Sequence, residues 1–206
     1  MDLPSPTTTG PLRQQMTAGL AAFAAWAYEV LDALGRCWFL LLATLSVGIA
    51  IAFVPQGRRL FPGLTVRDNL MLGRLRRTHA GADAWSDDRI FEIFPRLRER
   101  YDVNVELLSG GEQQMVAIAR ALAGHIKVLL LDEPFEGLSP AMTEEVFNAI
   151  HRLKGSVTML IVDHNLDLTL ALSDRALVLD RGRISHLGPA QPLLKDLDYR
   201  REKLWI

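Results

Sequence analysis

Short apolar runs alternate with segments of helical periodicity in this 206-residue chain. Such runs occur at Ile49–Val54, Val128–Leu131 and Val157–Val162, and runs of this length are typical of strands buried in a parallel sheet. Between the first and second of these runs, apolar residues recur every three or four positions from 115 to 122, as on one face of a helix. The pattern therefore predicts buried strands connected by helices.

Start and stop signals predict further helices. Thr65 is a candidate cap for a helix through Leu72, and Ser139 followed by Pro140 predicts a helix to about Leu153 that stops at Gly155. Pro95 should bend or divide the helix indicated by apolar residues from 90 to 97. Periodicity also predicts helices over 12–35 and 192–203, and the turn pair Arg181-Gly182 predicts a hairpin.

The segment 37–54 contains no charged residue over 18 positions, which is at the lower limit for a membrane-spanning helix. A buried helix that continues into a strand is the alternative. The β-branched and aromatic residues of Ile49–Val54 favour the strand. Because only 12 apolar residues then remain before it, we expect no membrane span here.

Two groups of polar residues flank the helix over 115–122. Before it, Ser109 and Glu112 have the spacing of a capping box, and Gly110 and Gly111 leave the amides of the helix start accessible. Such a helix terminus attracts anions. After it, Asp132 and Glu133 follow the strand Val128–Leu131, at the carboxyl edge where open α/β sheets bind ligands.

These two groups, in this order, resemble the signature sequence and Walker B strand of ATP-binding-cassette (ABC) ATPases. Gln56 in Val-Pro-Gln-Gly-Arg-Arg resembles the Q-loop glutamine, Glu136 lies in a segment like the D-loop, and His164 resembles the switch histidine. The resemblance covers about residues 49–206. Its phrases around Gln56 and Glu112 are similar to ATP-binding subunits of branched-chain amino acid or urea importers.

The resemblance implies a role for each matched residue. Glu133 would be the general base, and Gln56 and His164 would assist catalysis. Asp132 and Gln56 would contact Mg²⁺. The signature residues would bind ATP held on a partner subunit; these are Ser109, Gly110, Gly111 and Glu112.

The same resemblance requires a P-loop, whose Gly-Lys-Ser/Thr cradles the phosphates upstream of the Q-loop. The first lysine of this chain is Lys127, and no Gly-Lys pair occurs in it. We therefore expect an α/β fold with a partial doubly wound P-loop-NTPase-like sheet and an inserted helical subdomain over about 65–124. Residues 1–48 are an atypical helical or disordered segment, and 49–206 are the ABC-like ATPase domain without Walker A.

Four further observations limit the possible functions. The net charge of −1 gives no broad basic surface for nucleic acid. A single cysteine, Cys37, excludes a disulfide framework and suits a reducing compartment. No basic segment precedes a cleavable apolar core, so we expect no signal peptide. The absence of heptads disfavours a DNA-repair ATPase with the same signature.

Two functions remain open. The first is an ATP-binding and ATP-hydrolysing subunit of an ABC importer, with ATP and Mg²⁺ as cofactors. It would be cytoplasmic and peripheral on the inner face of the membrane. Its implied partners are transmembrane permease subunits and a second ABC ATPase subunit. The second is a non-hydrolysing remnant or accessory subunit that supplies only its signature motif to a partner's ATP site.

Overall fold

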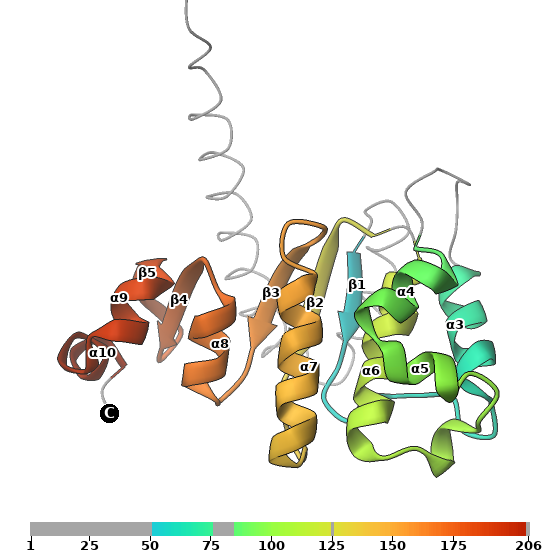
Figure 1. Ribbon diagram of the computed structural model, residues 1–206. Coiled ribbons are helices and arrows are strands. Elements are labelled where there is room, and N and C mark those ends of the chain that lie inside the picture. The colour runs from blue at the N-terminus through green and yellow to red at the C-terminus, as the bar shows by residue number, and fades with distance from the viewer. Residues whose placement is uncertain (1–50, 76–84, 125, 205–206) are drawn as a thin grey trace, which may run out of the picture. The chain divides into compact units, whose positions relative to one another are not determined.

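The computed structural model describes residues 51–75, 85–124 and 126–204 (Figure 1). The described residues belong to two compact units, which divide between Asp174 and Arg175. The larger unit contains a parallel sheet and most of the helices, and the smaller contains a hairpin and two short helices. The predicted helix over 12–35 and residues 37–50 of the apolar segment lie outside the described residues.

The sheet of the larger unit consists of three parallel strands in the order β1-β2-β3. They are β1 (Ile51–Val54), β2 (Val128–Asp132) and β3 (Thr158–Val162). Val54 pairs with Leu131, and Asp132 pairs with Val162. The register therefore places the carboxyl ends of all three strands at one edge, so that the loops after them begin side by side.

One face of this sheet is buried and the other is not. Val54, Leu129 and Leu131 join the hydrophobic core on the buried face. On the opposite face, Leu160 and Val162 of β3 are 43% and 53% exposed. The prediction that β3 is a fully buried strand is therefore wrong. Among the described strands, β3 pairs on one side only, with β2, and its burial alternates as in a half-covered strand.

Helices α3 to α6 lie between β1 and β2 in the chain, on the β1 side of the sheet in Figure 1. Helix α3 (Val66–Arg74) begins at Thr65, which forms a capping box with Asp68. Pro95 divides the next predicted helix into α4 (Asp87–Ile93) and α5 (Pro95–Glu99), since proline is accepted at a helix start but not inside it. The single turn η2 (Val105–Leu107) precedes α6 (Gly110–Leu122).

Helix α7 (Pro140–Arg152) follows β2, with Ser139 as its N-cap and Pro140 at its first position, as predicted. Gly155 follows the end of α7 with a φ of 83°, a conformation that glycine adopts without strain. Helix α8 (Leu166–Leu172) completes the larger unit, and Asn165 caps its start. The apolar faces of α6 and α7 contribute Ile118, Val146 and Ile150 to the core.

The smaller unit begins with the hairpin of β4 (Arg175–Asp180) and β5 (Arg183–Pro189). Arg181 and Gly182 form its two-residue turn, as predicted, and both have positive φ. The single helix predicted over 192–203 is wrong. The structure contains α9 (Ala190–Lys195) and α10 (Leu197–Leu204), because Asp196 adopts an extended conformation and its carboxylate accepts the first amides of α10.

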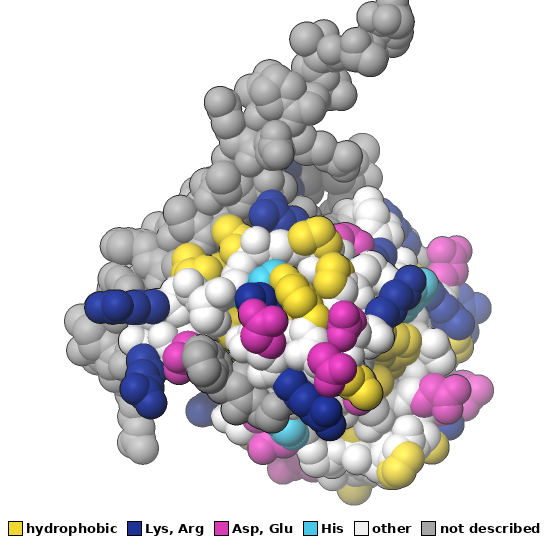
Figure 2. Space-filling view, turned by 90° about the vertical axis from the view of Figure 1, so that its left-hand side faces the viewer, with side chains coloured by type: hydrophobic (Ala, Val, Ile, Leu, Met, Phe, Trp, Pro, Cys, Tyr) yellow, Lys and Arg dark blue, Asp and Glu magenta, His cyan; other side chains and the backbone are white. Residues whose placement is uncertain are grey.

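Within the described part of the chain, no helix is long and apolar enough to cross a membrane. Basic and acidic side chains are interspersed on the surface shown in Figure 2, in agreement with the net charge of −1.

Candidate functional site

The loops at the carboxyl edge of the sheet bring together three of the residues predicted from the sequence. Gln56 follows β1, Glu133 follows β2, and His164 follows β3. The Gln56 side-chain amide donates hydrogen bonds to Glu133 Oε2 at 3.0 Å and to Glu136 Oε2 at 2.7 Å. The structure thus joins Gln56, the predicted Q-loop glutamine, to the predicted general base over a separation of 77 residues.

The backbone of Glu133 is held in an unusual conformation. Its φ is +46°, in the left-handed region that costs a non-glycine residue of the order of 1 kcal/mol. The Glu133 amide donates to the Val162 carbonyl at 2.7 Å. This bond fixes Glu133 to the end of β3, so that its side chain is directed by the sheet rather than by a free loop.

The carboxylates of this edge repel one another. The pKa of Asp132 is raised by burial first and also by the charges of Asp163 and Glu136, although the Gln56 backbone amide opposes the shift. The pKa of Glu133 is raised by desolvation and then by Glu136, while His164 lowers it. The edge therefore favours an added cation or the uptake of a proton.

Asp163 is a residue of this edge to which the sequence analysis assigned no role. Its side chain is fully buried. One carboxylate oxygen accepts the Phe135 amide at 3.3 Å, and the other accepts the Asn165 amide at 2.7 Å. Asp163 thus joins the loop after β2 to the loop after β3. The feature of the sequence that could have indicated Asp163 is its position directly after an apolar strand.

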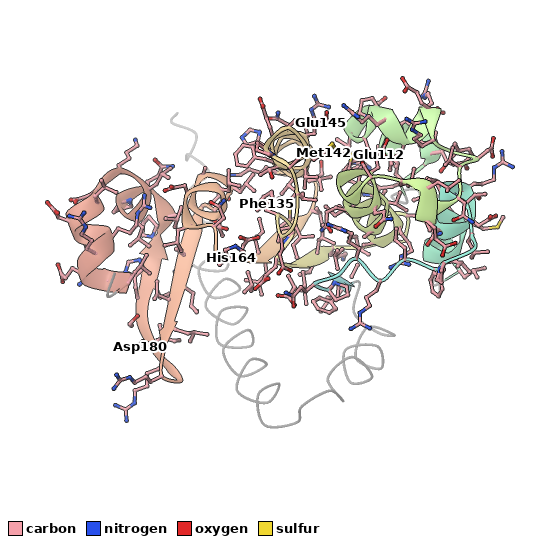
Figure 3. The ribbon with its side chains drawn as sticks, turned by 90° about the horizontal axis from the view of Figure 1, so that it is seen from below. Glu112, Phe135, Met142, Glu145, His164 and Asp180 are labelled. Atoms are coloured by element: carbon pink, nitrogen blue, oxygen red, sulfur yellow. The ribbon has the colours of Figure 1, made fainter. Side chains whose placement is uncertain are left out.

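The side chain of His164 is largely exposed to solvent at this edge. Its side chain is 71% exposed, and its Nδ1 lies 3.9 Å from Asp163 Oδ1, beyond hydrogen-bonding distance. Figure 3 labels His164 at the carboxyl end of β3. The described residues therefore leave the imidazole accessible to a ligand at this edge.

The predicted capping box is present at the start of α6. Ser109 Oγ accepts the Glu112 amide at 3.3 Å, and Glu112 Oε2 accepts the Ser109 amide at 2.9 Å. Glu112 is 7% exposed and also pairs with Arg100 at 3.2 Å. Its carboxylate is thus engaged inside the protein. Ser109 is exposed, so the helix start itself remains accessible.

The two signature glycines have different surroundings. A Cβ at Gly111 would lie 2.7 Å from Met142 Cβ, so only glycine lets α6 approach α7 this closely. Met142 and Glu112 are labelled on the neighbouring helices in Figure 3. A Cβ at Gly110 would instead meet the guanidinium of Arg58 at 3.2 Å. Arg58 also donates to the Glu136 carbonyl at 3.4 Å and thereby connects the signature to the acidic edge.

The donor set suits Mg²⁺ better than a metal that needs many protein ligands. In the described residues, no three acidic, histidine or cysteine side chains converge as a complete metal cage. Mg²⁺ commonly uses one or two carboxylates together with water and phosphate oxygens. Asp132, whose pKa is raised by burial and then by the charges of Asp163 and Glu136, fits this type of site as its carboxylate ligand. The side-chain carbonyl of Gln56 is the second predicted ligand.

Comparison with known proteins supports the resemblance to ABC ATPases. The model of the ABC transporter family matches residues 43–136. The high-affinity branched-chain amino acid transport ATP-binding protein BraG of Pseudomonas aeruginosa is 46% identical over 136 residues, which are 66% of this chain and 58% of that protein. The lipopolysaccharide export system ATP-binding protein LptB of Escherichia coli K12 is 36% identical over 154 residues, covering 73% and 64%.

A solved ATP-binding cassette of an ABC transporter has the same fold. It superposes with a TM-score of 0.57 and 27% identity, over 78% of this chain and 70% of that one. This likeness confirms the predicted α/β class and the partial P-loop-NTPase-like core. The chain spans less than two thirds of the length of BraG and of LptB. On these matches together, the chain has the fold of an ABC ATPase and is similar to the ATP-binding subunits of ABC transporters.

Proposed function

We propose that the chain is the ATP-binding subunit of an ABC importer for branched-chain amino acids or a related small solute. The observation that carries the proposal is the accessible start of α6, where exposed Ser109 and half-buried Gly110 begin a capped helix. A helix terminus with this chemistry binds a phosphate group through its amides and its dipole. The 46% identity to a branched-chain amino acid transport protein supports the cargo.

In this proposal, each site residue has a defined role. Ser109, Gly110 and Gly111 face the γ-phosphate of ATP held by a partner, while Glu112 maintains the capping box. Glu133 is the general base for the attacking water, and the side-chain amide of Gln56 orients the Glu133 carboxylate. Asp132 and Gln56 would hold Mg²⁺, which neutralises phosphate charge when bound. The exposed imidazole of His164 contacts the γ-phosphate.

The proposed partners are transmembrane permease subunits and a second ABC ATPase subunit. The proposed location is the cytoplasmic side of the membrane, as a peripheral subunit. LptB belongs to an export system, so the similarity to branched-chain amino acid transport proteins is the support for import. The net charge of −1 gives no broad basic surface that would attract nucleic acid, so we propose no nucleic-acid partner.

The second candidate is an accessory subunit that supplies its signature without hydrolysing ATP itself. The sequence favours it in one respect, since no Gly-Lys pair is present in these 206 residues. Without a phosphate cradle on the same chain, Glu133 would have no nucleotide on which to act. The two candidates share the signature function and differ only in the role of Glu133.

The test is phosphate release by a dimer of this chain with an intact sibling ATPase whose self-pairing is prevented. Ser109→Arg should lower the rate by about 100-fold, the scale on which a preorganised donor acts. Ser86→Arg is the matched control, because Ser86 is also an exposed N-cap that accepts an amide at 3.3 Å, at α4. The control should retain the rate of the unsubstituted dimer.

A Ser109→Arg variant as active as the Ser86→Arg control would refute both candidates. Glu133→Gln distinguishes between them. An unchanged rate would identify the accessory subunit, whereas a loss as large as that of Ser109→Arg would identify a hydrolysing subunit.

A further inference from the structure

The loop after Gln56 has a strained backbone. Gly57, Arg58 and Arg59 have φ values of 78°, 65° and 46°, so three successive residues are in the left-handed region. Glycine accepts this conformation without strain, but an arginine in it is strained by its Cβ. Strain of this kind persists only where neighbouring groups hold it in place.

Arg58 provides such contacts at one end of the turn. Its guanidinium donates to the Glu136 carbonyl at 3.4 Å. The same group lies where a side chain at Gly110 would be, 3.2 Å from the position of a Cβ, and 3.9 Å from that of Gly137. Arg58 is therefore packed between the start of α6 and the loop after β2.

Arg120 of α6 holds the other end of the turn. Its guanidinium donates to the Arg59 carbonyl at 2.8 Å and lies 5.1 Å from the centre of the Phe61 ring. Buried Asn69 accepts the Phe61 amide at 3.1 Å, which fixes the next segment to α3. Because Arg58 and Arg120 hold the two ends of the turn, they also determine in which direction the side chain of Gln56, directly before the turn, points.

We propose that Arg58 is a positioning residue that keeps the left-handed turn in place and thereby directs the Gln56 amide to Glu133 and Glu136. The packing of Arg58 against Gly110 makes this orientation dependent on the signature helix. The consequence for ATP turnover rests on the proposed function. The orientation itself does not, and it is measurable without nucleotide.

The experiment compares ¹H–¹⁵N spectra of the full chain and of Arg58→Ala, with the Gln56 side-chain amide signals assigned by their loss in Gln56→Met. In Arg58→Ala these signals should move to the positions of a solvent-exposed glutamine, because the bonds to the two carboxylates are lost. Arg59→Ala is the matched control. It removes the same charge at the next left-handed residue, whose side chain is exposed and whose carbonyl still accepts Arg120.

Gln56 signals that stay in place in Arg58→Ala would overturn the proposal, and so would an equal shift in Arg59→Ala. If Arg58→Ala does not fold, Gly110→Ala replaces it. The added Cβ would lie 3.2 Å from the guanidinium, so that Arg58 has to move by a few tenths of an ångström, and it should shift the same signals in the same direction by a smaller amount. An unchanged Gln56 spectrum in that variant would also overturn the proposal. A mixed dimer insensitive to Ser109→Arg would refute the proposed function and leave this result intact.

Discussion

At the scale of single residues, the carboxylate of Asp87 connects separate parts of the helical region of the larger unit. It forms an ion pair with Arg74 and accepts the Tyr101 hydroxyl at 2.8 Å. Burial of the carboxyl raises its pKa, but the hydrogen bonds from Arg74 and Tyr101 outweigh burial and lower it. Asp87 therefore links α3, α4 and the segment after α5 through its charged form.

We expect Asp87→Asn to lower the free energy of unfolding by about 1 kcal/mol at pH 7, since it weakens a partly exposed charged network. Urea denaturation measures the change. Asp88→Asn is the control, because Asp88 is 88% exposed and pairs with Arg98 only at the surface. Equal losses in the two variants would contradict the role assigned to Asp87.

The pH dependence of this difference has a definite sign. The folded-state pKa of Asp87 is lowered, so the stabilisation is present above the unfolded value of about 4. It is lost as the pH falls through the lower, folded-state pKa. The stability curves of the original chain and Asp87→Asn should therefore converge below pH 4 and remain apart at neutral pH.

At the scale of elements, the contact between α6 and α7 depends on Gly111. We expect Gly111→Ala to destabilise the chain by about 1–3 kcal/mol, because its methyl group would overlap Met142. Gly110→Ala should cost less, since its methyl group meets only the movable end of Arg58. Thermal unfolding of both variants measures the difference.

Shortening Met142 to Ala should recover part of the Gly111→Ala loss. A double-mutant cycle gives the coupling between the two positions. Additive effects would show that Gly111 is required for another reason than the approach of the two helices.

At the scale of the whole molecule, the acidic edge has no lysine from a phosphate cradle to balance it, because Lys127 is the first lysine in the chain. We expect the isolated chain to bind Mg²⁺–ATP only weakly, at millimolar rather than micromolar concentration. Equilibrium dialysis measures this affinity. Micromolar binding to the chain alone would contradict the expectation and indicate a cradle in residues that carry no such motif.

The domain boundaries predicted at residues 48 and 49 remain a prediction, because both residues lie outside the described part of the chain. The described unit boundary at Asp174 and Arg175 is an additional division that sequence patterns did not indicate. Residues 175–204 make their regular contacts among β4, β5, α9 and α10, and no change in composition marks where this unit begins.

The sequence by itself determined the local features of this protein. The capping box at Ser109, the start of α7 at Ser139, the break at Pro95 and the turn at Arg181 all formed as predicted. Each depends on residues within about four positions, so the short-range rules of capping and turns are sufficient. The apolar runs likewise predicted where the strands lie.

Only the tertiary structure decided which residues meet. Gln56 reaches Glu133 and Glu136 across about 80 positions, and Arg58 packs against Gly110. No local pattern indicates either contact, because strand order and register determine which loops are neighbours. The exposure of β3 has the same origin. An apolar run predicts a strand, but how far that strand is covered depends on the elements that the rest of the chain places on each of its sides.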